Sequence, residues 1–175
     1  LASGMDTDPV WSVVPPDSPA WLASASVNQW VDIPGTALSS VAPTPTPLGN
    51  TGPQSKINVW NGAALKRSTS TYYIAAAGGH QDYAGNEVNA LDLMRDAPAW
   101  VQLRAPTANN LIIGASSPGY PGSGYPQFFL DNRPAPTHTY SGSHYIPAQD
   151  RVMVFYSEGW TGNGQETAAW PGGYT

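Results

Sequence analysis

Cysteine is absent from this chain of 175 residues. That absence excludes disulfide bonds, thiolate metal ligands and cysteine nucleophiles together. It leaves the compartment open, because exported proteins can also lack cysteine.

Charge is sparse as well, with seven Lys and Arg against twelve Asp and Glu and a net charge of -5. Binding to a nucleic-acid backbone needs clustered cations, so we expect no nucleic-acid partner. No apolar run is long enough for a membrane span and no charged-then-apolar leader opens the sequence, so we expect no membrane span. The low charge, with abundant Thr, Ser, Gly, Tyr and Trp, favours an extracellular or virion-surface setting.

Glycine and proline are frequent, with eighteen residues of each. They interrupt every window in which a long helix could form. Seven Trp and nine Tyr supply enough apolar surface to offset the entropy lost on folding. A turn-rich and aromatic-rich composition of this kind predicts an all-β protein.

An internal repeat organises the sequence. Asn58–His80 aligns with His138–Trp160 without a gap, so that Gly62 falls on Gly142. With one gap the match extends to Glu87, which falls on Glu166. Repeated units bury their apolar faces against copies of themselves, so the sequence predicts a repeat protein.

Short strands separated by turn residues are predicted in each unit. Each end of the chain carries part of a further unit, because Trp30–Ile33 matches Trp100–Leu103 and would supply a fourth strand that closes a ring of sheets. The expected strands of the first unit are Ile57–Asn61, Thr71–Ala77, Asn86–Asp92 and Trp100–Leu103, and those of the second are His138–Gly142, Arg151–Tyr156 and a third around Glu166–Trp170.

Four strands, a Gly-Gly after the second and a Trp in the fourth resemble a kelch-type blade of a β-propeller. The strings AGGHQDYAGNEVNALDL and RPAPTHTYSGSHYIPAQDRVMVFY are similar to bacterial and phage-associated kelch-like proteins of the galactose-oxidase-like central domain class. The second unit departs from this pattern, with Glu158-Gly159 where Gly-Gly is expected. The resemblance implies an all-β fold of four-stranded antiparallel meanders. Because two units cannot close a propeller, we expect an incomplete propeller. We favour a chain that is part of a longer protein, and the alternative is that the missing blades come from elsewhere.

This organisation divides the chain into five segments. They are an N-terminal lead-in (1–27), a closing strand with a Pro-rich connector (28–56), a complete blade (57–103), a long inter-blade insertion (104–137) and a partial blade (138–175).

The long loops of such meanders leave from one face, which is therefore the candidate binding face. His80, Asp82 and Tyr83 follow the double glycine, and His138 is expected on the same face. An imidazole and a carboxylate two residues apart suit a metal or a sugar hydroxyl. The alternative is a turn in which Asp82 accepts backbone N–H groups.

Aromatic residues complete the candidate ligand-binding set. Tyr120, Tyr125 and Trp160 are expected on the candidate face, where flat rings suit stacking on sugars or packing against another subunit. The alternative is that they pack on their own fold. Three further tryptophans, Trp30, Trp60 and Trp100, are predicted to lie in the blade cores.

Catalytic machinery is not predicted. Loop sidedness separates His144 from His80 and His138, which argues against a three-histidine metal site. A galactose-oxidase-like copper centre needs a Tyr cross-linked to Cys, which this chain cannot supply. Glu87 recurs in the repeat, which favours a structural role. We therefore expect no catalytic residue, metal or cofactor in this chain.

Two functions stay open at this point. The first is a non-enzymatic propeller module that presents long aromatic loops to a glycan or protein partner, as a structural component of a virion or secreted assembly. The second is a kelch-like metal-dependent oxidase or hydrolase whose catalytic residues lie in blades outside this chain.

Overall fold

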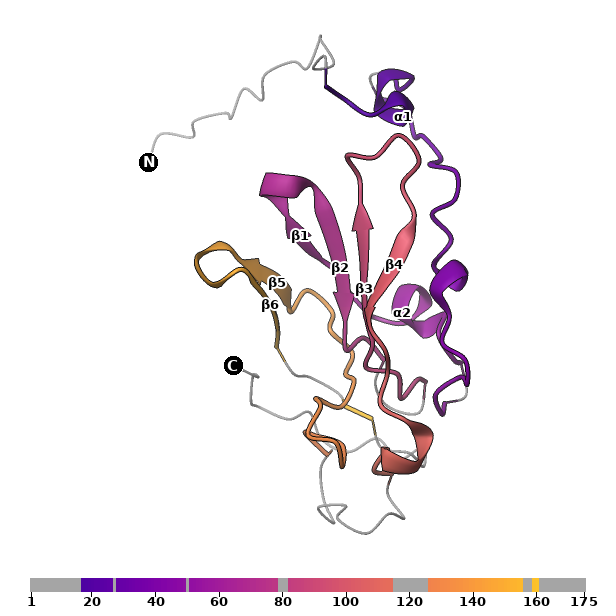
Figure 1. Cartoon of the computed structure of the whole chain (residues 1–175), viewed down its shortest axis with the longest axis vertical. Helices are drawn as coiled ribbons and strands as arrows, with labels where there is room; N and C mark the ends of the chain where they lie inside the picture. The colour runs from indigo at the N-terminus through magenta and orange to yellow at the C-terminus, as the bar shows by residue number, and fades with distance from the viewer. Residues whose placement is uncertain are drawn as a thin grey trace.

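The computed structural model describes most of the chain and is built mainly of strands. The described residues are 17–26, 28–49, 51–78, 82–114, 126–155 and 159–160. They form a four-stranded antiparallel sheet in the order β1-β2-β3-β4 and a two-stranded sheet, β5-β6 (Figure 1). The strands are β1 (Ala64–Lys66), β2 (Thr71–Ala75), β3 (Val88–Asp92), β4 (Trp100–Arg104), β5 (Ser143–Ile146) and β6 (Arg151–Val154).

The helical segments in the described part of the chain are all short, as the frequent proline and glycine predict. None of the helices in the described ranges is long and apolar enough to cross a membrane. They are α1 (Ala20–Ala23), α2 (Ser55–Asn58) and the 3₁₀ turns η1 (Leu38–Val41), η2 (Arg67–Thr69), η3 (Asn109–Leu111) and η4 (Pro147–Gln149).

The four-stranded sheet is an up-and-down meander, in which each strand pairs with the next along the chain. The β1–β2 and β3–β4 turns lie at one end of the sheet (Figure 1). Residues 82–87 and 105–114 lie towards the opposite end (Figure 1). The described residues are therefore mostly strands with few helices, and the four-stranded meander predicted for the first unit is present.

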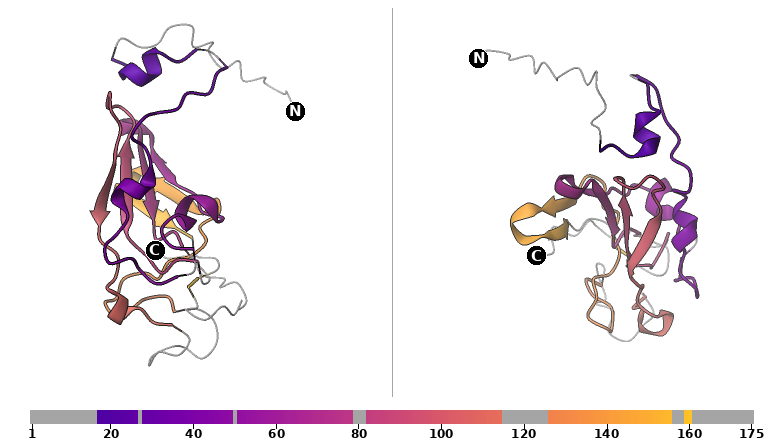
Figure 2. Two further views of the ribbon diagram at one scale, coloured as in Figure 1. Left: turned by 90° about the vertical axis from the view of Figure 1, so that its right-hand side faces the viewer. Right: turned by 45° about the horizontal axis from the view of Figure 1, so that its top comes forward.

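The sequence repeat is also a structural repeat. The order strand, 3₁₀ turn, strand occurs in β1-η2-β2 and again in β5-η4-β6. Ser70 and Asp150, at equivalent positions, end the two turns with the same positive φ of 49°. The second hairpin lies beside β1 and is tilted away from the first sheet (Figure 2).

The first strand of each unit was predicted too early in the sequence. The predicted strand Ile57–Asn61 is replaced by α2 and a turn, and β1 begins only at Ala64. The side-chain amide of Asn61 donates to the carbonyls of Ser55 and Val59, which ends the helix. In the second unit, His138–Gly142 is likewise a connection, and β5 begins at Ser143.

The closing strand predicted at Trp30–Ile33 is not formed, because this segment has no strand partner among the described residues. The predicted core role of Trp30 is wrong, since its side chain is fully exposed. The third strand predicted around Glu166–Trp170 lies outside the described residues.

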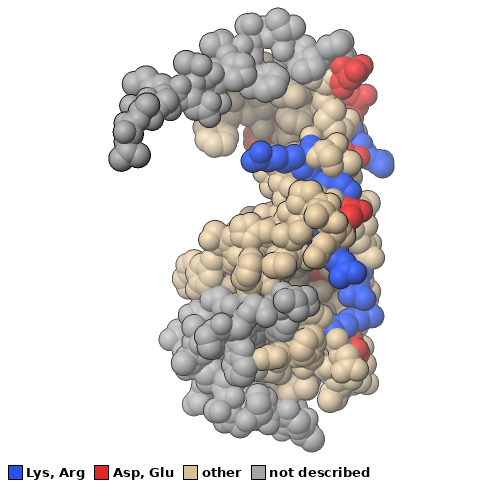
Figure 3. Space-filling model, turned by 90° about the vertical axis from the view of Figure 1, so that its left-hand side faces the viewer, with Lys and Arg blue, Asp and Glu red and all other residues tan. Residues whose placement is uncertain are grey.

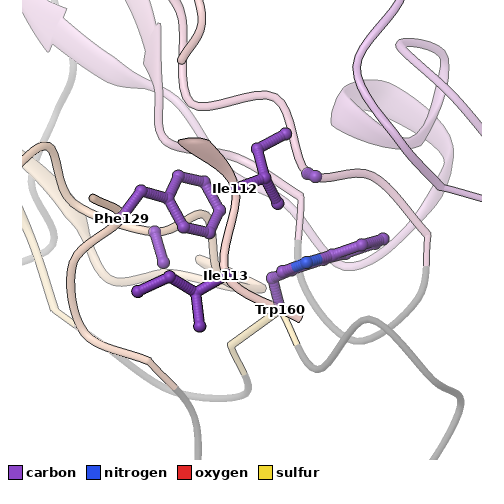
Figure 4. Packing of buried hydrophobic residues seen from close by; sticks show 6 residues of the cluster. Ile112, Ile113, Phe129 and Trp160 are labelled. Atoms are coloured by element: carbon purple, nitrogen blue, oxygen red, sulfur yellow. The ribbon is translucent and has the colours of Figure 1, made fainter. Parts of the chain in front are cut away.

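Among the described residues, two small clusters make up the apolar core. The first collects side chains from separate loops, including Ile112, Phe129 and Trp160 (Figure 4). The second packs Leu38 and Ile74 against Trp100, whose indole N–H donates to the carbonyl of Thr36 over 2.8 Å. The predicted core role of Trp100 is confirmed.

Candidate functional site

Two connecting segments, residues 59–62 and 138–142, lead into the two hairpins and lie side by side. The Tyr140 N–H donates to the Trp60 carbonyl over 2.8 Å, and the Gly62 N–H donates to the Thr139 hydroxyl over 2.7 Å. In the reverse direction, the Thr139 N–H donates to the Asn61 side chain over 3.1 Å. These three hydrogen bonds fix the two segments relative to each other. We call residues 59–62 and 138–142 the paired entry segments.

Each entry segment carries an exposed aromatic ring at the equivalent repeat position. Trp60 is 64% exposed and Tyr140 is 43% exposed. Both residues have a φ of 43°, a left-handed conformation that bulky residues rarely adopt. The predicted core role of Trp60 is therefore wrong. The same strained backbone conformation therefore occurs at both repeat positions, each time with an exposed aromatic side chain. Such a combination indicates a role other than packing.

His138 lies buried between the two rings. Its ring stands edge-on to Trp60, with centroids 5.2 Å apart, and edge-on to Tyr140, with centroids 6.0 Å apart. Its Nε2 atom lies 3.0 Å from Oδ2 of Asp82, and the other carboxylate oxygen of Asp82 accepts from the Thr51 hydroxyl over 3.2 Å. The imidazole of His138 therefore contacts both aromatic rings, and the carboxylate of Asp82 contacts the imidazole.

A second polar cluster is fully buried next to this site. Lys56 on α2 forms an ion pair with Glu87, with Nζ and Oε1 2.5 Å apart, and both side chains are 1% exposed. Lys56 also donates to the Asn89 side chain over 2.7 Å, and the Tyr83 hydroxyl donates to Glu87 over 2.7 Å. These contacts tie α2 to β3, which places the first entry segment at the edge of the sheet.

The electrostatics of this cluster follow from burial. Burial lowers the pKa of Lys56, and the neighbouring Glu87 carboxylate opposes that shift. Burial also raises the pKa of Tyr83, and the charge of Glu87 raises it further. Because the cluster is closed to solvent, its chemistry in this structure is that of a structural ion pair. This placement fits a structural role for Glu87, and its repeat counterpart Glu166 lies outside the described residues.

The seven predicted ligand-binding residues fall into three groups: two that contact each other near the exposed rings, two that are buried, and three that lie outside the described residues. Asp82 and His138 are brought together beneath the exposed rings, although 56 residues separate them. Tyr83 and Trp160 are buried, the first in the polar cluster and the second in the apolar core. For Trp160 the packing alternative therefore holds. His80, Tyr120 and Tyr125 lie outside the described residues, and their assignment stays a prediction.

The exposed pair Trp60 and Tyr140 was missed by the sequence analysis, which assigned Trp60 to the core. A signal was available, because each aromatic residue stands two positions before an aligned glycine, Gly62 and Gly142. An aromatic residue directly before such a turn is poorly placed for a strand. The repeat made this visible at two positions in one chain.

Charged side chains are few on the face of the molecule shown in Figure 3. On the face shown in Figure 3, Lys and Arg gather along one edge and the rest of the described surface is mostly uncharged. No group of three or more His, Asp or Glu within the described ranges is arranged to hold a metal ion. Comparison of the chain with protein-family models, with curated proteins and with solved structures found no match.

Proposed function

We propose that this chain is a non-enzymatic binding module made of kelch-type propeller blades, and that Trp60 and Tyr140 form its contact surface. Its partner is a glycan or a protein within a virion or secreted assembly. The propeller part of the proposal is supported by the repeated hairpins and by the four-stranded meander of the first unit.

The binding part is carried by one observation, the recurrence of an exposed ring on a strained backbone. A non-glycine residue held at positive φ costs about 1–3 kcal/mol. Apolar side chains stabilise a fold when burial removes them from water. Trp60 and Tyr140 are exposed, so burial of their rings offsets little of the backbone strain. Exposed aromatic residues in a rigid setting are typical of binding hot spots.

Contacts beneath the rings support binding rather than catalysis. The carboxylate of Glu87 is buried and ion-paired, and that of Asp82 is engaged with His138 and Thr51. An acid or base needs access to its substrate, so the buried Glu87 is not placed for proton transfer at the surface, while the Asp82 carboxylate, 25% exposed, is held by His138 and Thr51. What the site offers a partner is the two flat rings.

Replacing both rings tests whether they serve binding or folding. We expect the variant Trp60→Asn/Tyr140→Asn to unfold at the same free energy as the wild type or up to about 1 kcal/mol higher, because Asn tolerates positive φ better than Trp or Tyr. The measurement is urea unfolding followed by circular dichroism.

Trp100→Ala is the matched control. Trp100 packs in the core and donates a hydrogen bond, so its loss should lower the free energy of unfolding by about 2–3 kcal/mol. A comparable loss in the double Asn variant would show that the rings stabilise the fold, and the proposed contact surface would be wrong.

A further inference from the structure

We infer that the partner held by Trp60 and Tyr140 is a neutral glycan whose sugar rings stack on the two aromatic side chains. This inference rests on the proposed binding function and narrows it to one class of ligand.

Absence of charged residues along the two segments that carry the rings is the first argument. Residues 57–65 and 134–149, which contain the paired entry segments, include no Asp, Glu, Lys or Arg. Of the charged residues beneath them, Lys56 is buried in an ion pair and Asp82 is bonded to His138. A phosphate or acidic polysaccharide would need exposed cations, which these two segments do not supply. The site therefore suits an uncharged ligand.

Ring geometry is the second argument. The two rings belong to backbones joined by a hydrogen bond, and both stand edge-on to the same imidazole. Their backbones are therefore joined and each ring keeps one contact with the imidazole before any ligand arrives, which lowers the entropy cost of binding. The C–H faces of hexoses are apolar and flat, so they stack on preorganised aromatic rings.

Polar residues next to the two rings can form hydrogen bonds with the hydroxyl groups of a sugar. Asn58 and Ser141 are exposed and flank the two rings in sequence. Uncharged amide and hydroxyl groups both donate and accept hydrogen bonds, as sugar hydroxyls do. A few polar groups beside an apolar platform are the composition expected of a small-ligand site.

The test is calorimetric titration of the full chain with cellohexaose, maltohexaose, mannohexaose and chitohexaose, with a hyaluronan oligosaccharide as the acidic comparison. We expect at least one neutral oligosaccharide to bind with an affinity that changes little with salt. Trp60→Asn and Tyr140→Asn should each weaken that binding at least about tenfold, whereas Tyr72→Asn, which removes an exposed ring on β2, should leave it unchanged.

Three outcomes would overturn the inference: no neutral oligosaccharide binds, the acidic one binds more tightly, or the ring variants bind as the wild type does. A purified protein partner whose binding needs both rings would also overturn it while leaving the proposed binding function intact. Loss of stability in the ring variants would instead contradict the proposed function itself.

Discussion

Replacing Glu87 by Ala is expected to lower the free energy of unfolding by about 3–5 kcal/mol. The substitution leaves the Lys56 ammonium group in the interior without its carboxylate, and removes the acceptor of the Tyr83 hydroxyl. A buried charge without its partner is far more costly than a broken surface ion pair. Urea unfolding followed by tryptophan fluorescence measures the effect.

The control removes both charges together. Lys56→Met/Glu87→Leu replaces the ion pair by apolar groups of similar volume, so it should destabilise clearly less than Glu87→Ala. Tyr83→Phe, which removes one hydroxyl from the same cluster, should cost about 1 kcal/mol. If Glu87→Ala lost less than about 1 kcal/mol, Lys56 and Glu87 would not form the buried pair described.

Replacing Gly62 by Ala is expected to cost about 3 kcal/mol, because the entry segments approach each other too closely for a side chain there. A Cβ at Gly62 would lie 2.1 Å from the backbone carbonyl oxygen of Tyr140. Backbone atoms cannot move aside as a flexible side chain can, so the two segments must separate. Thermal unfolding measures the loss.

Gly142 is the equivalent position in the second unit and gives the matched control. Its nearest neighbour would lie 3.0 Å from an added Cβ, so Gly142→Ala should cost only about 1 kcal/mol. Equal losses at the two glycines would contradict the close approach of the entry segments.

Local signals explain the part of the fold that could be predicted. Strands β2, β4 and β6 begin where they were predicted, and β3 follows from the alternation around Val88, whereas β5 lies outside every predicted strand. The start of β1 could not be predicted, because Ile57–Asn61 has strand-like composition. Its helical turn depends on Asn61 and on contacts with distant residues.

Burial was less predictable than secondary structure. Trp30, Trp60 and Trp100 are the same residue type, yet only Trp100 has a core to enter. Which face an aromatic ring occupies depends on the neighbours that the fold supplies, and single-residue hydrophobicity does not contain that information.

Pairing of polar residues was the least predictable feature of the site. Asp82 and His138 were both proposed as ligand-binding residues, but their contact joins two different repeat units. Lys56 was not considered for the site, since a lysine is expected at the surface and not in a buried ion pair. Contacts of this kind arise from the tertiary fold and leave no pattern in the local sequence.

A double-mutant cycle on Trp60 and Tyr140, measured as affinity for the best-binding neutral oligosaccharide, tests the central claim most directly. If both rings contact the same ligand, the effects of the two substitutions on the binding free energy should be coupled by at least about 0.5 kcal/mol. The free energy of unfolding should stay unchanged. Single variants that retain wild-type affinity, or affinity losses that follow losses of stability, would contradict the account.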